Sequence, residues 1–476
     1  MNLCEKSALE LSSMLKNKEC SSEEITASVL DSIKNQDENI NAYITVDEEG
    51  ALKSAKLADE KRSKGEEMSS LAGIPVSLKD NIITKGILTT AGSKILSNFV
   101  APYDATVAEK LKANDMVILG KLNMDEFALG SSGENSYFKA TKNPLDFQKT
   151  AGGSSSGCGS AIASNEAILT LGTDSAGGAR IPASFCGAYA LKPTYGSVSR
   201  YGLIASTASM EQISPIAKTT KDVALLYDAI KGYDFHEATS INREYSPVID
   251  KLDGNINGLK IGIPAEYFSN AVDDEIKKLV MQAAEALKAQ GAELVSISLP
   301  STKDAIPAYY TLSCSEVSSN LSRYDGVRFG YRAESFSNIM ELYTRTRGEG
   351  FGDEVKKRII LGTYTLSSEN YETHYKRARL VSARISSEFD QAFGSCDIIL
   401  TPTAPTTAFN LGEKGDSLSM YEVDALTAPA GLAGLPAMSV PCGRVSNMPV
   451  GMQLIGRKFS EEDLLKLSNF YETKIK

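Results

Sequence analysis

Apolar residues recur at two different spacings along this chain, and the spacings predict helices alternating with strands. Residues 21–36, SSEEITASVLDSIKNQ, begin with a capping box of Ser21 and Glu24 and carry apolar residues at helical spacing. Residues 48–65 repeat the helical spacing and end at Gly65, a residue typical of a helix C-terminus. The first part of the chain is therefore expected to be helical.

Short apolar runs lie between the helical segments and predict strands. Strands are expected at residues 73–78, 116–122, 167–174, 258–264, 292–299, 397–403 and 451–457. Helices are expected at residues 220–234, 273–291 and 460–476. Strands that alternate with helices favour the α/β class, with a mixed, largely parallel central sheet covered by helices on both faces. No internal repeat or low-complexity linker divides the chain, so residues 1–476 are expected to form a single large domain.

Composition narrows the class of protein. The hydrophobic fraction of 42% and the charged fraction of 23% are typical of a globular chain. The net charge of −10 argues against a nucleic-acid-binding surface spread over the whole molecule. The N-terminus lacks the apolar core of a signal peptide and no run is long enough to span a bilayer, so no membrane partner is expected. Seven scattered cysteines without a CxxC pattern indicate free thiols and a cytoplasmic location.

Histidine is scarce, with only His236 and His374 in the chain. Neither lies near a serine-rich or acidic motif, so both are expected at the surface. A Ser-His-Asp triad or a His-ligated metal site would need one of them. We therefore expect no metal, and we expect any enzyme activity to use another proton carrier.

The run AGGSSSGCGSA, residues 151–161, is the densest glycine and serine segment of the chain. A phosphate-binding loop would need a Lys after its second glycine, and a dinucleotide fingerprint would need a third glycine; both are missing here. A linker is disfavoured because the segment continues directly into apolar sequence. The remaining interpretation is a loop that presents the hydroxyls of Ser154 and Ser155 before a helix that starts near Gly157, where backbone N–H groups hold an anion.

A serine in such a loop needs a base, and Lys79 is the candidate. It ends the apolar strand of residues 73–78, where a side chain is expected to point into the protein or a cleft. Burial disfavours the charged form of lysine and so lowers its pKa. The alternative is an ordinary surface lysine.

Four segments resemble the amidase signature family and occur in that family's order. They are GIPVSLKDNI (73–82), NMDEFALGSSGENS (123–136), GGSSSGCGSA (152–161) and LGTDSAGGARIPASFCG (171–187). The likeness runs over nearly the whole chain and implies a single amidase-like domain. A signature core of about residues 70–205 would carry the site, and a helical region of about residues 1–65 would pack on it.

Further segments resemble one branch of that family, the A subunits of glutamyl-tRNA(Gln) amidotransferases. They are LKPTYGSVSRYGLIA (191–205), YDGVRFGYR (324–332), EGFGDEVKKRIILGTYTLS (349–367) and LTAPAGLAGLPAMSVPCG (426–443). The resemblance implies hydrolysis of glutamine to supply ammonia, which converts misacylated Glu-tRNA(Gln) to Gln-tRNA(Gln). It also implies a cytoplasmic heterotrimer with the B and C subunits of that enzyme. This chain would bind no cofactor itself, the B subunit would bind most of the tRNA, and the assembled complex would use ATP and Mg²⁺ there.

The resemblance also implies roles for individual residues. Lys79 falls on the family's neutral lysine, and Ser154 falls on the bridging serine of a cis peptide. The turn of Ser175, Ala176 and Gly177 falls where backbone amides form an oxyanion hole.

Three residues far along the chain match the glutamine-binding positions of the family. Arg358 matches the residue that pairs with the α-carboxylate. Asp424 matches the residue that holds the α-amine, and Tyr309 matches an aromatic residue of the pocket.

The chain departs from the family at the nucleophile. The family turn reads roughly GSDTGGSIR, and the corresponding GTDSAGGAR places Gly178 at the position of the nucleophilic serine. Glycine has no hydroxyl and forms no acyl-enzyme. Four nearby positions also depart from the family, which suggests that the site has been reworked: Ser156, Cys158, Ala176 and Ala179.

Two questions stay open at this point. Ser175, Ser156 or Cys158 could supply a substitute nucleophile, or all three could simply pack. The chain could therefore be an amidotransferase subunit with an impaired or altered glutaminase step. It could also be a catalytically silent partner of the other subunits, or a stand-alone amidase of another substrate.

Overall fold

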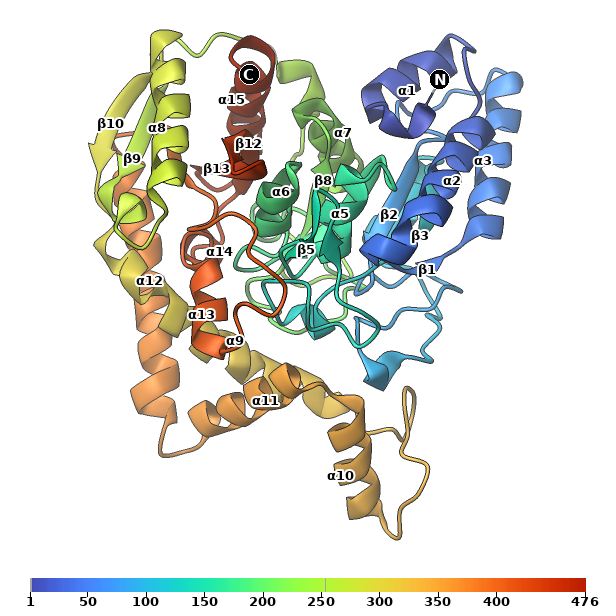
Figure 1. Ribbon diagram of the computed structural model, residues 1–476, viewed down its shortest axis with the longest axis vertical. Coiled ribbons are helices and arrows are strands. Elements are labelled where there is room, and N and C mark those ends of the chain that lie inside the picture. The colour runs from blue at the N-terminus through green and yellow to red at the C-terminus, as the bar shows by residue number, and fades with distance from the viewer. Residues whose placement is uncertain (1, 253) are drawn as a thin grey trace.

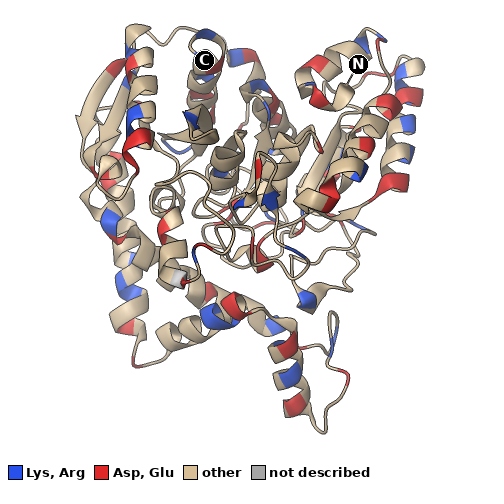
Figure 2. Cartoon of the chain, in the orientation of Figure 1, with Lys and Arg blue, Asp and Glu red and all other residues tan. Residues whose placement is uncertain are grey.

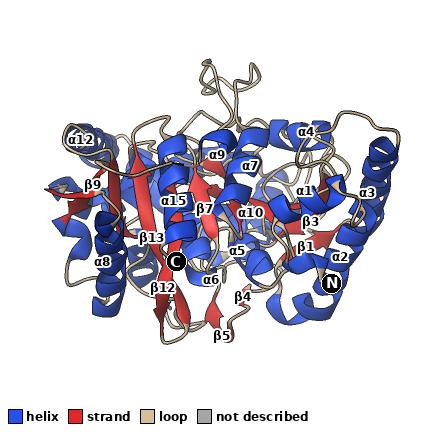
Figure 3. Ribbon diagram, turned by 90° about the horizontal axis from the view of Figure 1, so that it is seen from above, coloured by secondary structure: helices blue, strands red, loops and turns tan. Residues whose placement is uncertain are grey.

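The computed structural model describes residues 2–252 and 254–476. Eleven strands form one large sheet that crosses the molecule, and helices pack around it (Figures 1 and 3). In spatial order, the strands are β1 (Tyr43–Val46), β3 (Val117–Leu122), β2 (Pro75–Lys79), β6 (Leu169–Asp174), β8 (Gln212–Ala217), β7 (Tyr189–Lys192), β12 (Ala437–Val445), β13 (Met448–Gly456), β11 (Ile398–Pro402), β9 (Lys260–Pro264) and β10 (Glu293–Ile297). A separate hairpin pairs β4 (Lys142–Asn143) with β5 (Asp146–Thr150).

The helices account for most of the remaining chain. They are α1 (Ala8–Lys16), α2 (Ser22–Ile40), α3 (Glu48–Ser63), α4 (Thr106–Ala113), α5 (Ser156–Ala163), α6 (Arg180–Cys186), α7 (Thr220–Ile230), α8 (Asp274–Ala289), α9 (Ala305–Asn320), α10 (Ile339–Gly350), α11 (Asp353–Leu366), α12 (Lys376–Ala392), α13 (Ser417–Tyr421), α14 (Ala428–Leu432) and α15 (Glu461–Lys474). The expected α/β class, with a mixed central sheet and helices on both faces, is confirmed. In the described part of the chain, none of the helices has the length and apolar character needed to cross a membrane.

Parallel pairing is confined to two blocks of the sheet. β3, β2 and β6 form one parallel block, and β11, β9 and β10 form the other. The strands between the blocks pair antiparallel. One cause is local: only Ser446 and Asn447 separate β12 from β13, and both have positive φ (47° and 66°), which is the geometry of a tight hairpin turn. Parallel pairing was expected in the core of the sheet. It is found in two blocks that flank an antiparallel centre.

The N-terminal helices form as their sequence predicts. Ser21 Oγ accepts the Glu24 amide at 3.1 Å, and the Glu24 carboxylate accepts the Ser21 amide at 2.8 Å, which completes the capping box. The apolar face of α2 is buried, including Ile25 and Val29. α2 packs on α3, and α3 packs on β3. The division into a helical region up to about residue 65 and a core of about 70–205 stays a prediction.

A group of long helices extends from one side of the sheet. α9 packs against both α11 and α12, and α10 projects from the lower edge of the molecule in Figure 1. Basic and acidic residues are interspersed along outer helices such as α2, α3 and α10, as Figure 2 shows.

The parallel block of β2 and β6 positions the site. Every residue of both strands is buried, and Leu78 is in register with Leu171. Because the strands are parallel, their carboxyl ends meet at the same edge of the sheet, where α/β proteins usually bind ligands. β2 ends at Lys79 and β6 ends at Asp174, so both chain segments that carry the expected chemistry leave the sheet side by side.

Candidate functional site

Lys79 lies inside the protein, as its position at the end of an apolar strand predicts. Its side chain is fully buried, and Nζ lies 2.7 Å from Ser154 Oγ and 2.8 Å from Thr173 Oγ1. Burial lowers the pKa of Lys79, although nearby carboxylates, above all Glu211, oppose that effect. The amine is thereby placed to lose its charge and act as a base.

The glycine-serine loop holds Ser154 beside Lys79 and ties itself to the turn after β6. The peptide bond between Gly153 and Ser154 is cis. Ser155 donates its amide to Gly178 O at 2.8 Å and its hydroxyl to Thr173 O at 3.1 Å. α5 begins at the next residue, close to the helix start expected from the sequence. The loop and the turn are therefore joined by direct hydrogen bonds.

Two residues that the sequence did not single out complete the surroundings of Lys79. Thr173 Oγ1 accepts from Lys79 and donates to Glu211 Oε1 at 2.7 Å. Glu211 is 2% exposed, and burial raises the pKa of its carboxyl, while Lys79 lowers it. The sequence signal was weak, since Glu211 is a lone acidic residue just before an apolar strand.

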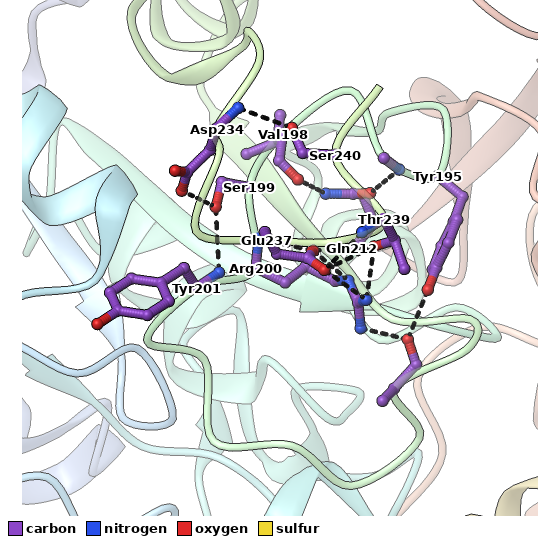
Figure 4. Close-up of polar contacts among 12 residues, drawn as sticks. Tyr195, Val198, Ser199, Arg200, Tyr201, Gln212, Asp234, Glu237, Thr239 and Ser240 are labelled. Carbon is purple, nitrogen blue, oxygen red and sulfur yellow. Dashed lines mark hydrogen bonds and ion pairs between the residues drawn. The ribbon is translucent and has the colours of Figure 1, made fainter. Parts of the chain in front are cut away.

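A polar cluster around Arg200 lies near Gln212, the residue that follows Glu211 (Figure 4). Arg200 donates to Thr239 Oγ1 at 2.8 Å, and its Nε lies 3.2 Å from Glu237 Oε2. The side chain of Gln212, the first residue of β8, bonds with the backbone of the segment that precedes it. These bonds hold the backbone next to Glu211 in one position.

A buried ion pair shapes the turn between β6 and α6. Asp174 Oδ1 lies 2.8 Å from the guanidinium of Arg180, and neither side chain is exposed. Burial raises the pKa of Asp174, but Arg180 outweighs burial and brings the pKa to about 2. The Asp174 carboxylate also accepts the amides of Gly177, Ala179 and Arg180 itself. Three amides of the turn thus donate to one carboxylate that stays negatively charged.

These hydrogen bonds bear on the expected oxyanion hole of Ser175, Ala176 and Gly177, which stays a prediction. The Gly177 amide donates to Asp174 Oδ1 at 2.8 Å, so it is already paired. Within residues 2–252 and 254–476, no protein acceptor is found for the amides of Ser175, Ala176 or Gly178. All three of these residues line the cavity described below, so these amides are the free donors of the turn.

Gly178 stands directly over Ser154. A Cβ built on Gly178 would lie 2.9 Å from Ser154 Oγ and 2.6 Å from Thr173 O. A side chain at this position would therefore start beside the Ser154 hydroxyl. It would also require the turn to move slightly, because 2.6 Å is too short for a contact with a carbonyl oxygen.

The three expected glutamine-binding residues come together with Ser154 around one cavity. Tyr309 on α9, Arg358 on α11 and Asp424 beyond α13 line it with Ser154. Arg358 is 3% exposed, and its Nε donates to Glu354 Oε1 at 2.8 Å. Its terminal nitrogens donate to no group of the described chain, so they are free to pair with a carboxylate as a fork.

Asp424 has a polar but enclosed environment. Its Oδ2 accepts from Tyr310 at 2.7 Å and from Ser131 at 2.9 Å. Burial raises the pKa of Asp424 to about 7, although both hydrogen bonds oppose the rise. Tyr310 also stacks on Tyr421, and the Arg358 guanidinium lies 4.7 Å from the Tyr310 ring centre. A cation next to Asp424 would restore its full negative charge.

The cavity is nearly closed. It measures about 10 Å³, which is room for about one water molecule. Tyr309 contributes to the closure, because its hydroxyl lies 2.7 Å from Ser175 Oγ across the pocket wall. A ligand the size of an amino acid does not fit this space unless groups of the cavity wall move.

The three substitute nucleophiles considered above lie in different surroundings. Ser156 donates to Thr141 Oγ1 at 3.0 Å and is fully buried. Cys158 is also fully buried, and burial raises the pKa of its thiol to about 12. Neither residue lines the cavity, whereas Ser175 does. Both histidines, His236 and His374, are exposed, and no cluster of metal-ligating side chains occurs among the described residues.

Comparisons with known proteins identify the family. The family model named Amidase matches residues 24–465. Proteins named as the A subunit of glutamyl-tRNA(Gln) amidotransferase are 48% identical in Clostridium botulinum (strain Okra / Type B1) and 49% identical in Persephonella marina, each over 100% of this chain and 98% of the relative.

Solved structures of two related proteins share the fold of this chain. The A subunit of the Thermotoga maritima glutamyl-tRNA(Gln) amidotransferase, known from a crystal structure, is 36% identical, with a TM-score of 0.82, over 99% of this chain and 95% of that one. The peptide amidase of Stenotrophomonas maltophilia is 28% identical, with a TM-score of 0.84, over 98% of this chain and 96% of that one.

Proposed function

The chain belongs to the amidase family, and we propose that it is the ammonia-supplying A subunit of a glutamyl-tRNA(Gln) amidotransferase. The complex would convert Glu-tRNA(Gln) to Gln-tRNA(Gln). The relatives that carry this name match the chain from end to end at nearly half identity, which supports the whole subunit rather than a shared fold alone.

One observation carries the proposal. Arg358, Asp424 and Tyr309 come from three separate segments, yet they line the same small cavity as Ser154. A guanidinium fork, a carboxylate and an aromatic hydroxyl are the groups that would hold the α-carboxylate, the α-amine and the carbon chain of an amino acid. The side-chain amide of a bound glutamine would then point toward Ser154 and Lys79.

The catalytic roles follow from the same geometry. Lys79 would act as a neutral base through Ser154, since its amine is buried and contacts that hydroxyl. The amides of Ala176 and Gly178 would stabilise the oxyanion, because they have no protein acceptor and belong to residues that line the cavity. The hydroxyl that attacks in the family would come from position 178, which here is glycine.

Partners are part of the proposal. The B and C subunits of the amidotransferase would complete a heterotrimer in the cytoplasm. The B subunit would bind most of the tRNA and use ATP and Mg²⁺ to activate the glutamate, while this chain would bind no cofactor. The charge of −10 and the interspersed charges of the outer helices fit a chain that leaves the tRNA largely to its partner (Figure 2).

A silent assembly partner is the second candidate function, and Gly178 is the observation that favours it. Such a chain would hold the other two subunits together while free ammonia served as the nitrogen source. A stand-alone amidase of another substrate has less support, because the segments around Tyr324, Arg358 and Asp424 resemble the complex-forming branch.

Amidation of Glu-tRNA(Gln) by the assembled complex tests the proposal. The complex is assayed with ATP and Mg²⁺, and with either glutamine or ammonium as the nitrogen source. We expect normal turnover with ammonium, slow turnover with glutamine, and faster turnover with glutamine in the Gly178→Ser complex. No amidation from either source would contradict the assignment to this complex. Amidation from ammonium alone, unchanged in Gly178→Ser, would favour the silent partner.

A further inference from the structure

Lys79 contacts the wall of the cavity at one hydroxyl. Its side chain is fully buried and does not line the cavity wall, and Nζ contacts Ser154 Oγ and Thr173 Oγ1. Thr173 Oγ1 faces away, toward Glu211 Oε1. Ser154 is therefore the cavity-lining hydroxyl whose proton Lys79 can take directly.

Three serines line the cavity, and their partners differ. Ser131 donates to Asp424, and Ser175 shares a hydrogen bond with Tyr309. Ser154 alone among them contacts a basic nitrogen, at 2.7 Å. A serine is activated as a nucleophile by an adjacent base, and lysine serves as that base in some hydrolases. By this criterion Ser154 is the activated hydroxyl of the cavity.

The glycine at 178 also uncovers Ser154. Any side chain there would place its Cβ 2.9 Å from Ser154 Oγ and would stand between that oxygen and a ligand. With glycine at this position, no side-chain atom of residue 178 crowds Ser154 Oγ. The amides of Ala176 and Gly178 have no protein acceptor, belong to residues that line the cavity and are available to an oxyanion.

We propose that Ser154 is itself the nucleophile of this chain, activated directly by Lys79, so that a Ser–Lys pair replaces the three-residue relay of the family. The proposal rests on the proposed function, because it takes glutamine as the substrate. It assigns Ser154 an attacking role where the family resemblance implies only a bridging one.

The chemistry balances with water as the one further reactant. The neutral Lys79 amine takes the Ser154 proton as Oγ bonds to the side-chain carbonyl carbon of glutamine. The resulting ammonium gives a proton to the amide nitrogen, the C–N bond breaks, and ammonia leaves. Water then attacks the ester carbon and gives a proton to Lys79, and Ser154 Oγ regains that proton as glutamate departs.

Covalent labelling of the complete complex tests the assignment. The probe is the diazoketone analogue of glutamine, diazo-oxo-norleucine, and peptide mapping by mass spectrometry locates the adduct in the native chain. We expect the adduct on Ser154. An adduct on Ser175, or no adduct on the native chain combined with glutamine turnover no faster than that of Lys79→Met, would overturn the proposal.

Variants separate this proposal from the function on which it rests. Ser154→Ala is expected to lower the slow native turnover of glutamine by about 100-fold or more, whereas Ser160→Ala, on α5 and outside the cavity wall, is expected to leave it unchanged. Gly178→Ala is expected to slow the native reaction, because it covers Ser154 and adds no hydroxyl. If Gly178→Ser hydrolyses glutamine while native Ser154 is never labelled, the Ser154 assignment fails and the proposed function stands. If Gly178→Ser is also inert with glutamine, the proposed function fails.

Discussion

The backbone of Gly178 packs directly over the hydroxyl of Ser154, so that a Cβ at position 178 would lie 2.9 Å from Ser154 Oγ. The family resemblance places a nucleophilic serine at position 178, and this position lies beside the contact of Ser154 with Lys79 but carries no hydroxyl. The rest of the machinery is in place, with Lys79 buried and in contact with Ser154. We expect the missing hydroxyl to change the reaction more than the fold.

The affinity for glutamine is predicted to depend on pH through Asp424. Its pKa is raised to about 7 by burial, so its carboxyl becomes neutral as the pH falls below that value. A neutral carboxyl holds an α-ammonium group less well, and KM for glutamine should therefore rise as the pH falls from about 8 to about 6. Steady-state kinetics across this range measures the effect. Asp424→Asn should raise KM at every pH and remove most of its pH dependence. If KM of Asp424→Asn still rises as the pH falls, Asp424 is not the group that binds the α-ammonium.

Removing the charge of Glu211 is predicted to shift the pH–rate profile. Glu211 raises the pKa of Lys79, against the larger effect of burial. Glu211→Gln keeps the shape of the side chain and removes that opposing charge, so the Lys79 amine becomes neutral at lower pH. The ascending limb of kcat against pH should move to lower pH for glutamine hydrolysis. A shift to higher pH would contradict this view. Glu237→Gln, in the neighbouring Arg200 cluster (Figure 4), serves as a matched control that should leave the limb in place.

The buried pair of Asp174 and Arg180 is predicted to be costly to break. Arg180→Met leaves the Asp174 carboxylate buried without its partner, which typically costs about 3–5 kcal/mol. The exposed pair of Lys34 and Glu48 provides the control, because removing it should cost about 0–1 kcal/mol. Denaturant unfolding of the two variants measures both values. Equal losses in the free energy of unfolding for the two variants would show that the stability of the turn does not depend on the pair of Asp174 and Arg180.

Cys158 is predicted to be chemically inert in the folded protein. It is fully buried, and burial raises the pKa of its thiol to about 12, so little thiolate exists at neutral pH. Alkylation with iodoacetamide, followed by peptide mapping, should leave Cys158 unmodified until the chain is denatured. Cys158→Ala should hydrolyse glutamine within about twofold of the native rate. Rapid labelling in the native state, or a large loss of turnover, would restore Cys158 as a candidate nucleophile.

Local sequence pattern was enough to locate part of the site. Lys79 was found because a lysine ending an apolar strand is unusual, and Ser154 was found because glycines surround it. Glu211 and the Asp174–Arg180 pair were missed, since their importance arises from burial against distant segments. The hydrogen bond of the Gly177 amide to Asp174 was not foreseen, because sequence cannot tell which acceptor a turn amide will meet.

For the fold as well, the sequence predicted individual elements but not the contacts between distant segments. The helices and strands with clear periodicity were predicted close to their observed bounds, including α2, α8, β2 and β6. The alternation of helices and strands indicated the class, but it does not reveal which strands are neighbours. β7, β8 and β12 were not predicted, and they make up much of the antiparallel centre. The pairing of β7 with β12 joins segments that lie far apart in sequence.

Restoring a hydroxyl at position 178 tests most directly whether its absence limits glutamine hydrolysis by this chain. Glutamine hydrolysis by the complex is measured for the native chain, for Gly178→Ser and for Gly178→Ala, which adds the Cβ without the hydroxyl. We predict that Gly178→Ser raises kcat at least about 100-fold, since loss of a nucleophile costs as much as about 10⁶ elsewhere and the turn must move to admit a side chain. Gly178→Ala should not gain activity. A native chain that hydrolyses glutamine as fast as Gly178→Ser would contradict this interpretation.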